Sequence, residues 1–303
     1  MSVPFNQNLD NTERLVEAPE FIEFFKISNS PWANFFPTEI VDSVNIEFIV
    51  KKPKKPEVKI IAWDDKSKRY ELPYVDTDKI SKKITKKYLA GEIIADVDLK
   101  ANNGQNLLDS MQYEVANDLA DKLAIDDTQA IAKFATKIDI EDTTPVGYLK
   151  SMLSAWNTLF QFRNIANSKF FITNGLYDSL VYLADNKGLI TDNQLAQQLR
   201  LNGNNLYVKG VLCEIVLDDY MIFTNDKNEQ QLMTFVLATP RAMKRYMIEN
   251  TVIYVDFIKD DKAGRAYKVA GEVVGEAIPH IFLIMKQHQD ECYVELLKQK
   301  KLI

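Results

Sequence analysis

The sequence predicts an α+β protein, and three observations support this class. A continuous helical pattern without proline or glycine runs over residues 105–135. After it, short β-branched segments alternate with helical ones, as is typical of mixed α+β domains. Before it lies a strand-rich segment with a strong positive charge. With 303 residues and 46% hydrophobic content, the chain can bury a substantial core in about two domains.

The first forty residues carry no sustained period but are rich in large apolar side chains. The aromatic members of this set are Phe21, Phe24, Phe25, Trp32, Phe35 and Phe36. A short segment of this kind cannot form a core alone and would leave a large apolar patch exposed. We therefore expect residues 1–40 to be an arm that lies on another surface.

The next segment predicts an extended, basic ribbon. Residues 44–50, 57–63 and 69–75 have the composition and partial alternation of strands, with Pro53 and Pro56 in the first connection. Residues 50–90 hold 13 Lys or Arg and 6 Asp or Glu, a net charge of +7, so the rest of the chain carries −13 of the total of −6. Such a segment contacts nucleic acid, contacts the acidic body of another copy, or is a solvated loop.

The long helix has one apolar stripe, formed by Leu108, Met111, Val115, Leu119 and Leu123. At about 1.5 Å per residue it would be roughly 45 Å long, and a break near Asp126 would shorten it. A second helix follows Pro145, which suits the first turn. Further strands are expected at 169–173, 206–211, 214–217, 235–238, 251–258, 267–274 and 281–285, with helices at 175–184 and about 287–300.

No catalytic, cofactor or metal site is predicted, and we do not expect an enzyme. Cys213 and Cys292 stand far apart without a CxxC pattern, and both suit buried positions. His280 and His288 lack partners for catalysis or metal binding. The remaining candidates are weak: the doublets at 64–65, 126–127, 218–219 and 260–261 lack calcium-loop spacing and suit turns or caps, and residues 271–275 lack the strand-then-helix context of a dinucleotide loop.

The chain has neither a membrane-spanning run nor a secretory leader pattern, so the sequence predicts a cytoplasmic protein without membrane contact.

The order of elements resembles the major capsid proteins of tailed phages, which have the Hong Kong 97 fold. Four stretches carry the resemblance: residues 120–127, 170–174, 206–216 with the turn at Lys209 and Gly210, and 267–283. The resemblance implies an N-terminal arm at 1–40, an extended β-hairpin loop at 41–92 and a peripheral domain with a long spine helix at 93–167. It further implies an axial α/β domain at 168–274, and a return strand of the peripheral domain with a C-terminal tail at 275–303.

The resemblance also implies a function: self-assembly into the hexamers and pentamers of an icosahedral shell enclosing double-stranded DNA, with assembly in the host cytoplasm and a final place in the virion capsid. The implied partners are copies of the chain, a separate scaffolding protein, a portal, and DNA bound without sequence specificity. A separate scaffold is implied because no scaffolding domain of about a hundred residues precedes the loop. Some relatives join a loop lysine to an asparagine, but no partner asparagine is evident here.

Two groups of residues are then expected to contact neighbouring subunits. The six aromatic residues of the arm form one group. The loop supplies the other: Lys51, Lys52, Lys54, Lys55, Trp63, Lys66, Lys68, Arg69 and Tyr70. Two alternatives stay open, an encapsulin-like nanocompartment shell protein and a nucleic-acid-binding protein that uses residues 50–90, whose aromatic and basic residues could stack single strands.

Overall fold

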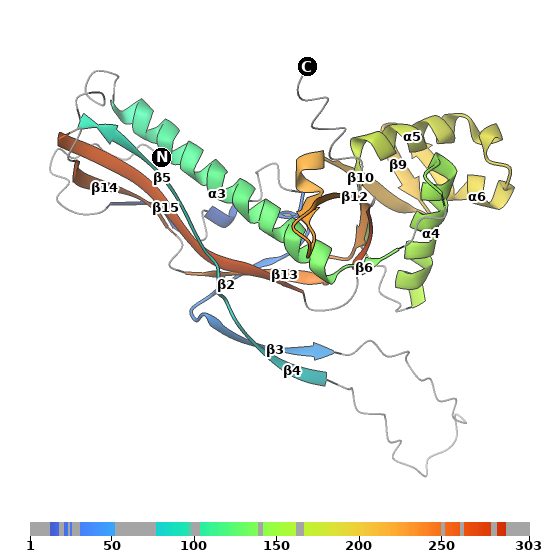
Figure 1. Cartoon of the computed structure of the whole chain (residues 1–303), viewed down its shortest axis with the longest axis horizontal. Helices are drawn as coiled ribbons and strands as arrows, with labels where there is room; N and C mark the ends of the chain where they lie inside the picture. Colours follow the sequence, from blue (N-terminus) through green and yellow to red (C-terminus); the bar gives the residue numbers. More distant parts are fainter. Residues whose placement is uncertain are drawn as a thin grey trace, which may run out of the picture.

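The computed structural model describes residues 13–17, 21–23, 25, 31–51, 77–96, 98, 104–138, 142–161, 167–249, 252–260, 264–279 and 284–288. Within these, the chain forms two large sheets linked by one long helix, and a separate two-stranded ribbon (Figure 1). The predicted α+β class is confirmed. None of the helices described is long and apolar enough to cross a membrane.

The first sheet, which we call the peripheral sheet, has six strands in the order β1-β14-β15-β13-β2, with β5 paired to β15. Its strands are β1 (Glu13–Glu17), β2 (Thr38–Val41), β5 (Lys87–Ala95), β13 (Met243–Ile248), β14 (Val252–Asp260) and β15 (Gly264–Pro279). The strands β5 and β15 pair over nine residues, although they are far apart in sequence.

The second sheet, the axial sheet, has eight strands in the order β6-β16-β12-β7-β10-β9-β8, with β11 paired to β12. The strands are β6 (Thr136–Lys137), β7 (Lys169–Thr173), β8 (Leu199–Asn202), β9 (Asn205–Val208), β10 (Val211–Val216), β11 (Ile222–Thr224), β12 (Gln230–Ala238) and β16 (Ile284–His288). The turn between β9 and β10 has positive φ at Lys209 and Gly210, as two-residue hairpins require.

The spine helix α3 (Gly104–Phe134) is continuous, so the break considered near Asp126 is absent. Its apolar stripe lies on the peripheral sheet, where Leu108, Met111, Val115, Leu119 and Leu123 are buried. The helix approaches β15 closely at Gly271, where an added Cβ would lie 2.5 Å from the Leu119 side chain. From Ala124 onward the same helix packs into the core of the axial sheet, so α3 belongs to both cores.

The helices α4 (Pro145–Gln161), α5 (Asn174–Asp185) and α6 (Asn193–Gln198), with two short 3₁₀ turns, η1 (Lys187–Leu189) and η2 (Asp218–Tyr220), complete the axial part. Thr144 caps α4 by accepting a hydrogen bond from the Gly147 N–H at 3.1 Å, and Pro145 occupies the first turn. Asp192 caps α6 by accepting from the N–H groups of Gln194 and Leu195.

The structure corrects the predicted domain boundaries. The strands β13, β14 and most of β15 were predicted in the axial domain, but they belong to the peripheral sheet, where β15 pairs with β5, β13 and β14. Conversely, β16 was predicted to return to the peripheral domain and instead pairs with β12, and α4 packs on the axial sheet. The errors have one cause: strand composition marks a strand but does not tell which distant strand it pairs with.

Candidate assembly surfaces

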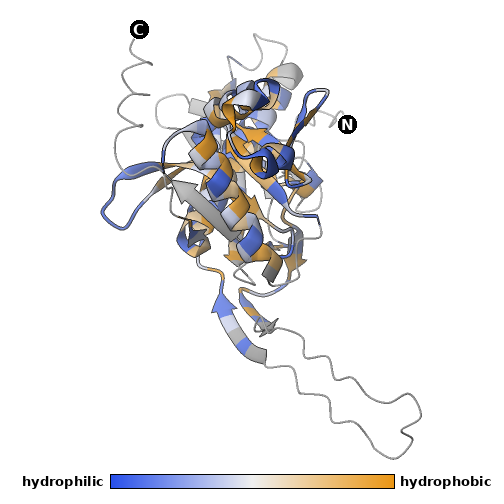
Figure 2. Cartoon of the chain, turned by 90° about the vertical axis from the view of Figure 1, so that its right-hand side faces the viewer, coloured by the Kyte–Doolittle hydropathy of each residue, from blue (hydrophilic) through white to orange (hydrophobic). Residues whose placement is uncertain are grey.

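The ribbon consists of β3 (Asn45–Lys51) and β4 (Thr77–Lys83), which pair in antiparallel register with each other and with no other described strand. Figure 2 shows it standing away from the body of the protein. It is anchored at its base, where Ile46 and Ile84 are buried against Tyr246, Ile248 and Ile278. The Ile84 N–H also donates to the Val44 carbonyl at 2.8 Å. Beyond this base, no strand of the described part of the body pairs with the ribbon.

Charged side chains cover the described part of the ribbon. Lys79, Lys82 and Lys83 are exposed, and Lys79 pairs with Glu47 across the strands at 2.5 Å. Both side chains of this pair are more than half exposed, so solvent screens their attraction and it contributes little to stability. Lys82 lies over the ring of Phe134 at the end of α3, 5.3 Å from its centroid.

The outward face of α3 is acidic. Glu114, Asp118 and Asp121 are exposed and follow one another at four- and three-residue steps, which places them on one side of the helix. Lys122 is the one basic side chain exposed between residues 109 and 122. Asp121 also accepts a hydrogen bond from the Tyr220 hydroxyl at 2.8 Å, and with burial this raises the pKa of Tyr220 to about 12. This face of α3 therefore carries a net negative charge.

Two consecutive carboxylates hold the centre of α3 to both neighbouring strands. The Asp126 carboxylate accepts from Lys86 Nζ at 2.6 Å and from the Tyr88 hydroxyl at 2.5 Å. The next residue, Asp127, is buried and pairs with the buried Arg245 of β13, which also donates to the Leu123 carbonyl at 3.0 Å. The pair therefore joins α3 to β13 where the two cores meet.

Burial dominates the electrostatics of this junction. It raises the pKa of Asp127 to about 6 although Arg245 opposes the shift, and burial together with Asp126 raises the pKa of Tyr88. The Arg245 guanidinium stacks over the Phe25 ring at 5.6 Å, while its Nε and Nη1 have no hydrogen-bond partner within the described structure. The sequence prediction that the Asp126–Asp127 doublet lies in a turn or cap is thus wrong. One signal was available: Asp127 follows Leu123 by four residues, so it continues the apolar stripe.

The structure places the arm's aromatic residues inside the chain's own cores. Phe21 and Phe25 pack against α3 in the peripheral core. Trp32 and Phe35 make edge-to-face contacts with Phe171 of β7, with ring centroids 4.8 Å apart in both cases. The Trp32 Nε1–H also donates to the Thr128 hydroxyl at 2.9 Å.

The predicted role of these side chains as inter-subunit contacts is corrected accordingly. Phe21, Phe25, Trp32, Phe35 and Phe36 are all at most 8% exposed, so they offer no surface to a neighbour. Phe24 lies outside the described residues.

Most of the predicted loop contacts also lie outside the described residues: Lys52, Lys54, Lys55, Trp63, Lys66, Lys68, Arg69 and Tyr70. The strands predicted at 57–63 and 69–75 fall in the same range. Lys51 is the last residue of β3 and pairs in register with Thr77. The contact role of these nine residues stays a prediction.

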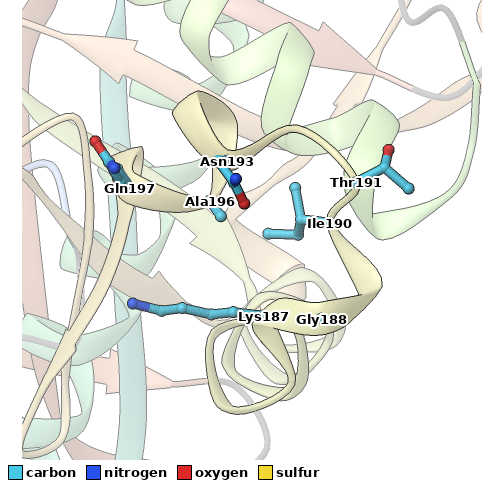
Figure 3. Close-up of a pocket in the computed structure, with 7 residues that line it drawn as sticks. All are labelled: Lys187, Gly188, Ile190, Thr191, Asn193, Ala196 and Gln197. Atoms are coloured by element: carbon cyan, nitrogen blue, oxygen red, sulfur yellow. The ribbon is translucent and has the colours of Figure 1, made fainter.

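One hollow lies at the outer end of the axial part, around η1 and α6. Figure 3 shows its lining, with Lys187, Gly188, Ile190, Thr191, Asn193, Ala196 and Gln197 around an open space of about 570 Å³. Lys187 is the one ionisable side chain of that lining, so neither an acid–base pair nor an activated nucleophile is present there. No group of three His, Cys, Asp or Glu side chains gathers into a metal site in the described ranges.

Solved structures with a similar fold are capsids. The mature capsid of bacteriophage PhiM1 matches with a TM-score of 0.55 and 10% identity, over 88% of this chain and 89% of that one. The capsid of an empty GTA particle matches with a TM-score of 0.55 and 8% identity, over 94% of both chains. A virus-like particle from Pyrococcus furiosus matches with a TM-score of 0.52 and 10% identity, over 88% of this chain and 95% of that one.

Comparison of sequences is less informative than comparison of structures. No family model matches the chain. An uncharacterized protein of Methanocaldococcus jannaschii is 25% identical over 214 residues, which cover 63% of this chain and 47% of that protein. The chain thus spans about half the length of this curated relative.

The fold is therefore that of the major capsid proteins of tailed phages, and the fold prediction made from the sequence is confirmed.

Proposed function

We propose that this protein is the subunit of a self-assembling capsid shell. The single observation that carries the proposal is the ribbon, which stands away from the body in a fold shared with capsid proteins and is buried, within the described residues, only at its base. An isolated two-stranded ribbon is marginal in water, because it buries too little apolar surface to offset its ordering entropy. A neighbouring copy would supply the missing packing partner.

Charge favours the acidic face of α3 on that neighbour as the surface that receives the ribbon. The ribbon segment is basic, whereas Glu114, Asp118 and Asp121 are exposed on α3. Complementary potentials of this kind fix register and orientation more than they add affinity. Because exposed charges are screened beyond about 10 Å at 0.1 M salt, assembly should weaken as salt rises.

The finer parts of the proposal follow from the resemblance. The copies would form hexamers and pentamers, with a scaffolding protein and a portal taking part in assembly in a host cytoplasm. The shell would enclose double-stranded DNA, and the net charge of −13 outside residues 50–90 supports a wall that does not hold phosphate tightly.

A shell that encloses a protein cargo is the second candidate. The fold is compatible with such a shell as well, and a virus-like particle from Pyrococcus furiosus has a similar fold. The two candidates share every assembly surface described above and differ in what the shell contains.

The test is light scattering after size separation, with electron microscopy of the same fractions. Closed particles or ring-shaped oligomers are expected, and they should dissociate more readily at high salt. A monomer that persists at all concentrations and salts would contradict the proposal. Nuclease-protected DNA inside the particles would support the virus, and a co-purifying protein cargo would support the nanocompartment. A monomer that binds DNA would support the nucleic-acid-binding alternative.

A further inference from the structure

The strand β5 is an open edge of the peripheral sheet. It pairs with β15 on one side, and no described strand pairs with its other side. Leu89 and Ile93 are exposed on it by 64% and 56%. Natural proteins usually protect a long edge strand, so an edge of nine residues that shows two large apolar side chains is a place where another strand can add.

The backbone of this edge presents hydrogen-bonding groups at known positions. The Gly275 N–H donates to the Lys86 carbonyl, so the even-numbered residues of β5 face β15. Antiparallel strands alternate in this respect, so Lys87, Leu89, Gly91, Ile93 and Ala95 direct their N–H and C=O groups outward. Gly91, in the middle of this edge, is exposed.

We propose that β5 pairs antiparallel with β5 of a second copy across a two-fold axis at Gly91. This register brings Leu89 opposite Ile93 of the second copy, and the reverse, so both apolar residues gain apolar partners. It also joins the outward-facing residues to one another, giving about ten backbone hydrogen bonds. A two-fold contact brings the same surface of both copies together, so that surface must be complementary to itself. The strand β5 meets this condition when the axis passes through Gly91, its central residue.

The charges at the two ends of the strand favour the same arrangement. At the start of β5 lie Lys86 and Lys87, which pair with Asp126 and Glu272, and Lys82 and Lys83 precede them at the base of the ribbon. At the other end, residues 92–98 carry Glu92, Asp96 and Asp98 and no basic residue. Antiparallel pairing places the basic end of each copy beside the acidic end of the other. Parallel pairing would place like charges together. Complementary charge therefore selects a second copy of this chain, in antiparallel orientation, as the occupant of the edge.

The contact would make one continuous sheet from two peripheral sheets. Since its partner is a copy of the same chain, the inference rests on the proposed function and deepens it. The two can fail separately, because particle formation and the β5 register are measured in different ways.

The first test compares two double variants that lose the same apolar surface. Leu89→Lys with Ile93→Lys places like charges opposite each other across the axis, whereas Leu89→Glu with Ile93→Lys places opposite charges there. Sedimentation of the full chain should show an association constant about tenfold lower for the first variant than for the second. Equal constants in two folded variants would overturn the proposal. Both positions are exposed, so circular dichroism should show an unchanged fold.

The second test reads the register with cysteines, in a chain carrying Cys213→Ala and Cys292→Ser. Ala90 and Glu92 of the second copy are predicted to face each other in a pair without backbone hydrogen bonds, with Cα atoms about 4.5 Å apart. Ala90→Cys and Glu92→Cys chains should each stay uncross-linked alone and form a disulfide when mixed. Particles without this cross-link would overturn the β5 contact and leave the shell standing. A cross-linked dimer that never forms particles would do the reverse.

Discussion

The N-terminal segment and the ribbon were expected to behave alike, and they do not. The sequence predicts that each is extended and that each needs a neighbouring copy to bury its apolar groups. The N-terminal segment instead finds its partners within the chain: Phe21 and Phe25 in the peripheral core, Trp32 and Phe35 against Phe171. The ribbon is buried within the described structure at its base alone, through Ile46 and Ile84.

The difference lies in what each segment offers to the body. Large aromatic rings bury much area each and pack within the two cores of the chain, so intrachain packing is sufficient for them. The lysines of the ribbon keep their ammonium groups in water and gain nothing from the apolar interior. A segment of the second kind suits a charged surface on another copy. Four predictions sharpen or break this contrast.

The largest effect is expected for Trp32→Ala. The ring is fully buried, contacts Phe171 and donates to Thr128, so its removal leaves a cavity in the axial core and removes this hydrogen bond. We expect a loss of about 5 kcal/mol in the free energy of unfolding, measured by chemical denaturation. The control Phe160→Ala, at a half-exposed ring, should cost far less. Equal small losses would mean that the arm does not belong to the body.

Arg245→Ala should follow, with a loss of about 3–4 kcal/mol, because it leaves the buried Asp127 carboxylate without its partner. Arg241→Ala, at an exposed position two residues before β13, is the matched control and should change stability by less than about 0.5 kcal/mol. An Arg245→Ala protein as stable as the control would show that the pair does not hold α3 to β13.

A change of pH should alter the free energy of unfolding by less than the Arg245→Ala substitution does, and the pKa shift of Asp127 sets the sign of the change. Burial raises the pKa of Asp127 from its ordinary value of 3.8 to about 6, so between these values the folded state binds a proton that the unfolded state releases. This group therefore adds stability as the pH falls from 7 to 5. Denaturation at both pH values should show that the wild type gains relative to Asp127→Asn. A parallel response of the two proteins would refute the shift.

The smallest effect on folding is expected in the ribbon. Lys79→Gln with Lys83→Gln should change the free energy of unfolding of the subunit by less than about 0.5 kcal/mol, because both side chains are exposed. The same variant should assemble at a higher threshold concentration in light scattering. Lys187→Gln with Lys227→Gln removes equal charge from the axial part and should leave the threshold unchanged. If both variants shift it equally, the ribbon has no special role in assembly.

Local patterns predicted many of the elements well. The apolar stripe from Leu108 to Leu123 predicted α3 within one residue at each end, and the strand predicted at Lys169–Thr173 is β7. Both signals are contained in a single element. The strand β5 was missed, because Leu89 and Ile93 on one face and Tyr88 and Ile94 on the other blur the alternation that marks a half-buried strand.

Long-range features could not be predicted from the pattern. The Asp127–Arg245 pair joins residues 118 apart in sequence, and β5 pairs with a strand from the far end of the chain. The arm was misassigned for the same reason: a cluster of aromatic residues predicts burial but does not say whether the partner is the same chain or another copy. The sequence analysis therefore failed for contacts whose partner lies far away in the sequence.

Hydrogen exchange of the ribbon amides, before and after assembly, tests the central claim most directly. In dilute, unassembled subunits the amides of β3 and β4 should exchange at least about 100-fold faster than those of β15, and in assembled particles they should become protected. If the strands of the ribbon are already as protected as β15 in the separate subunit, no neighbour is needed to complete them, and the account is contradicted.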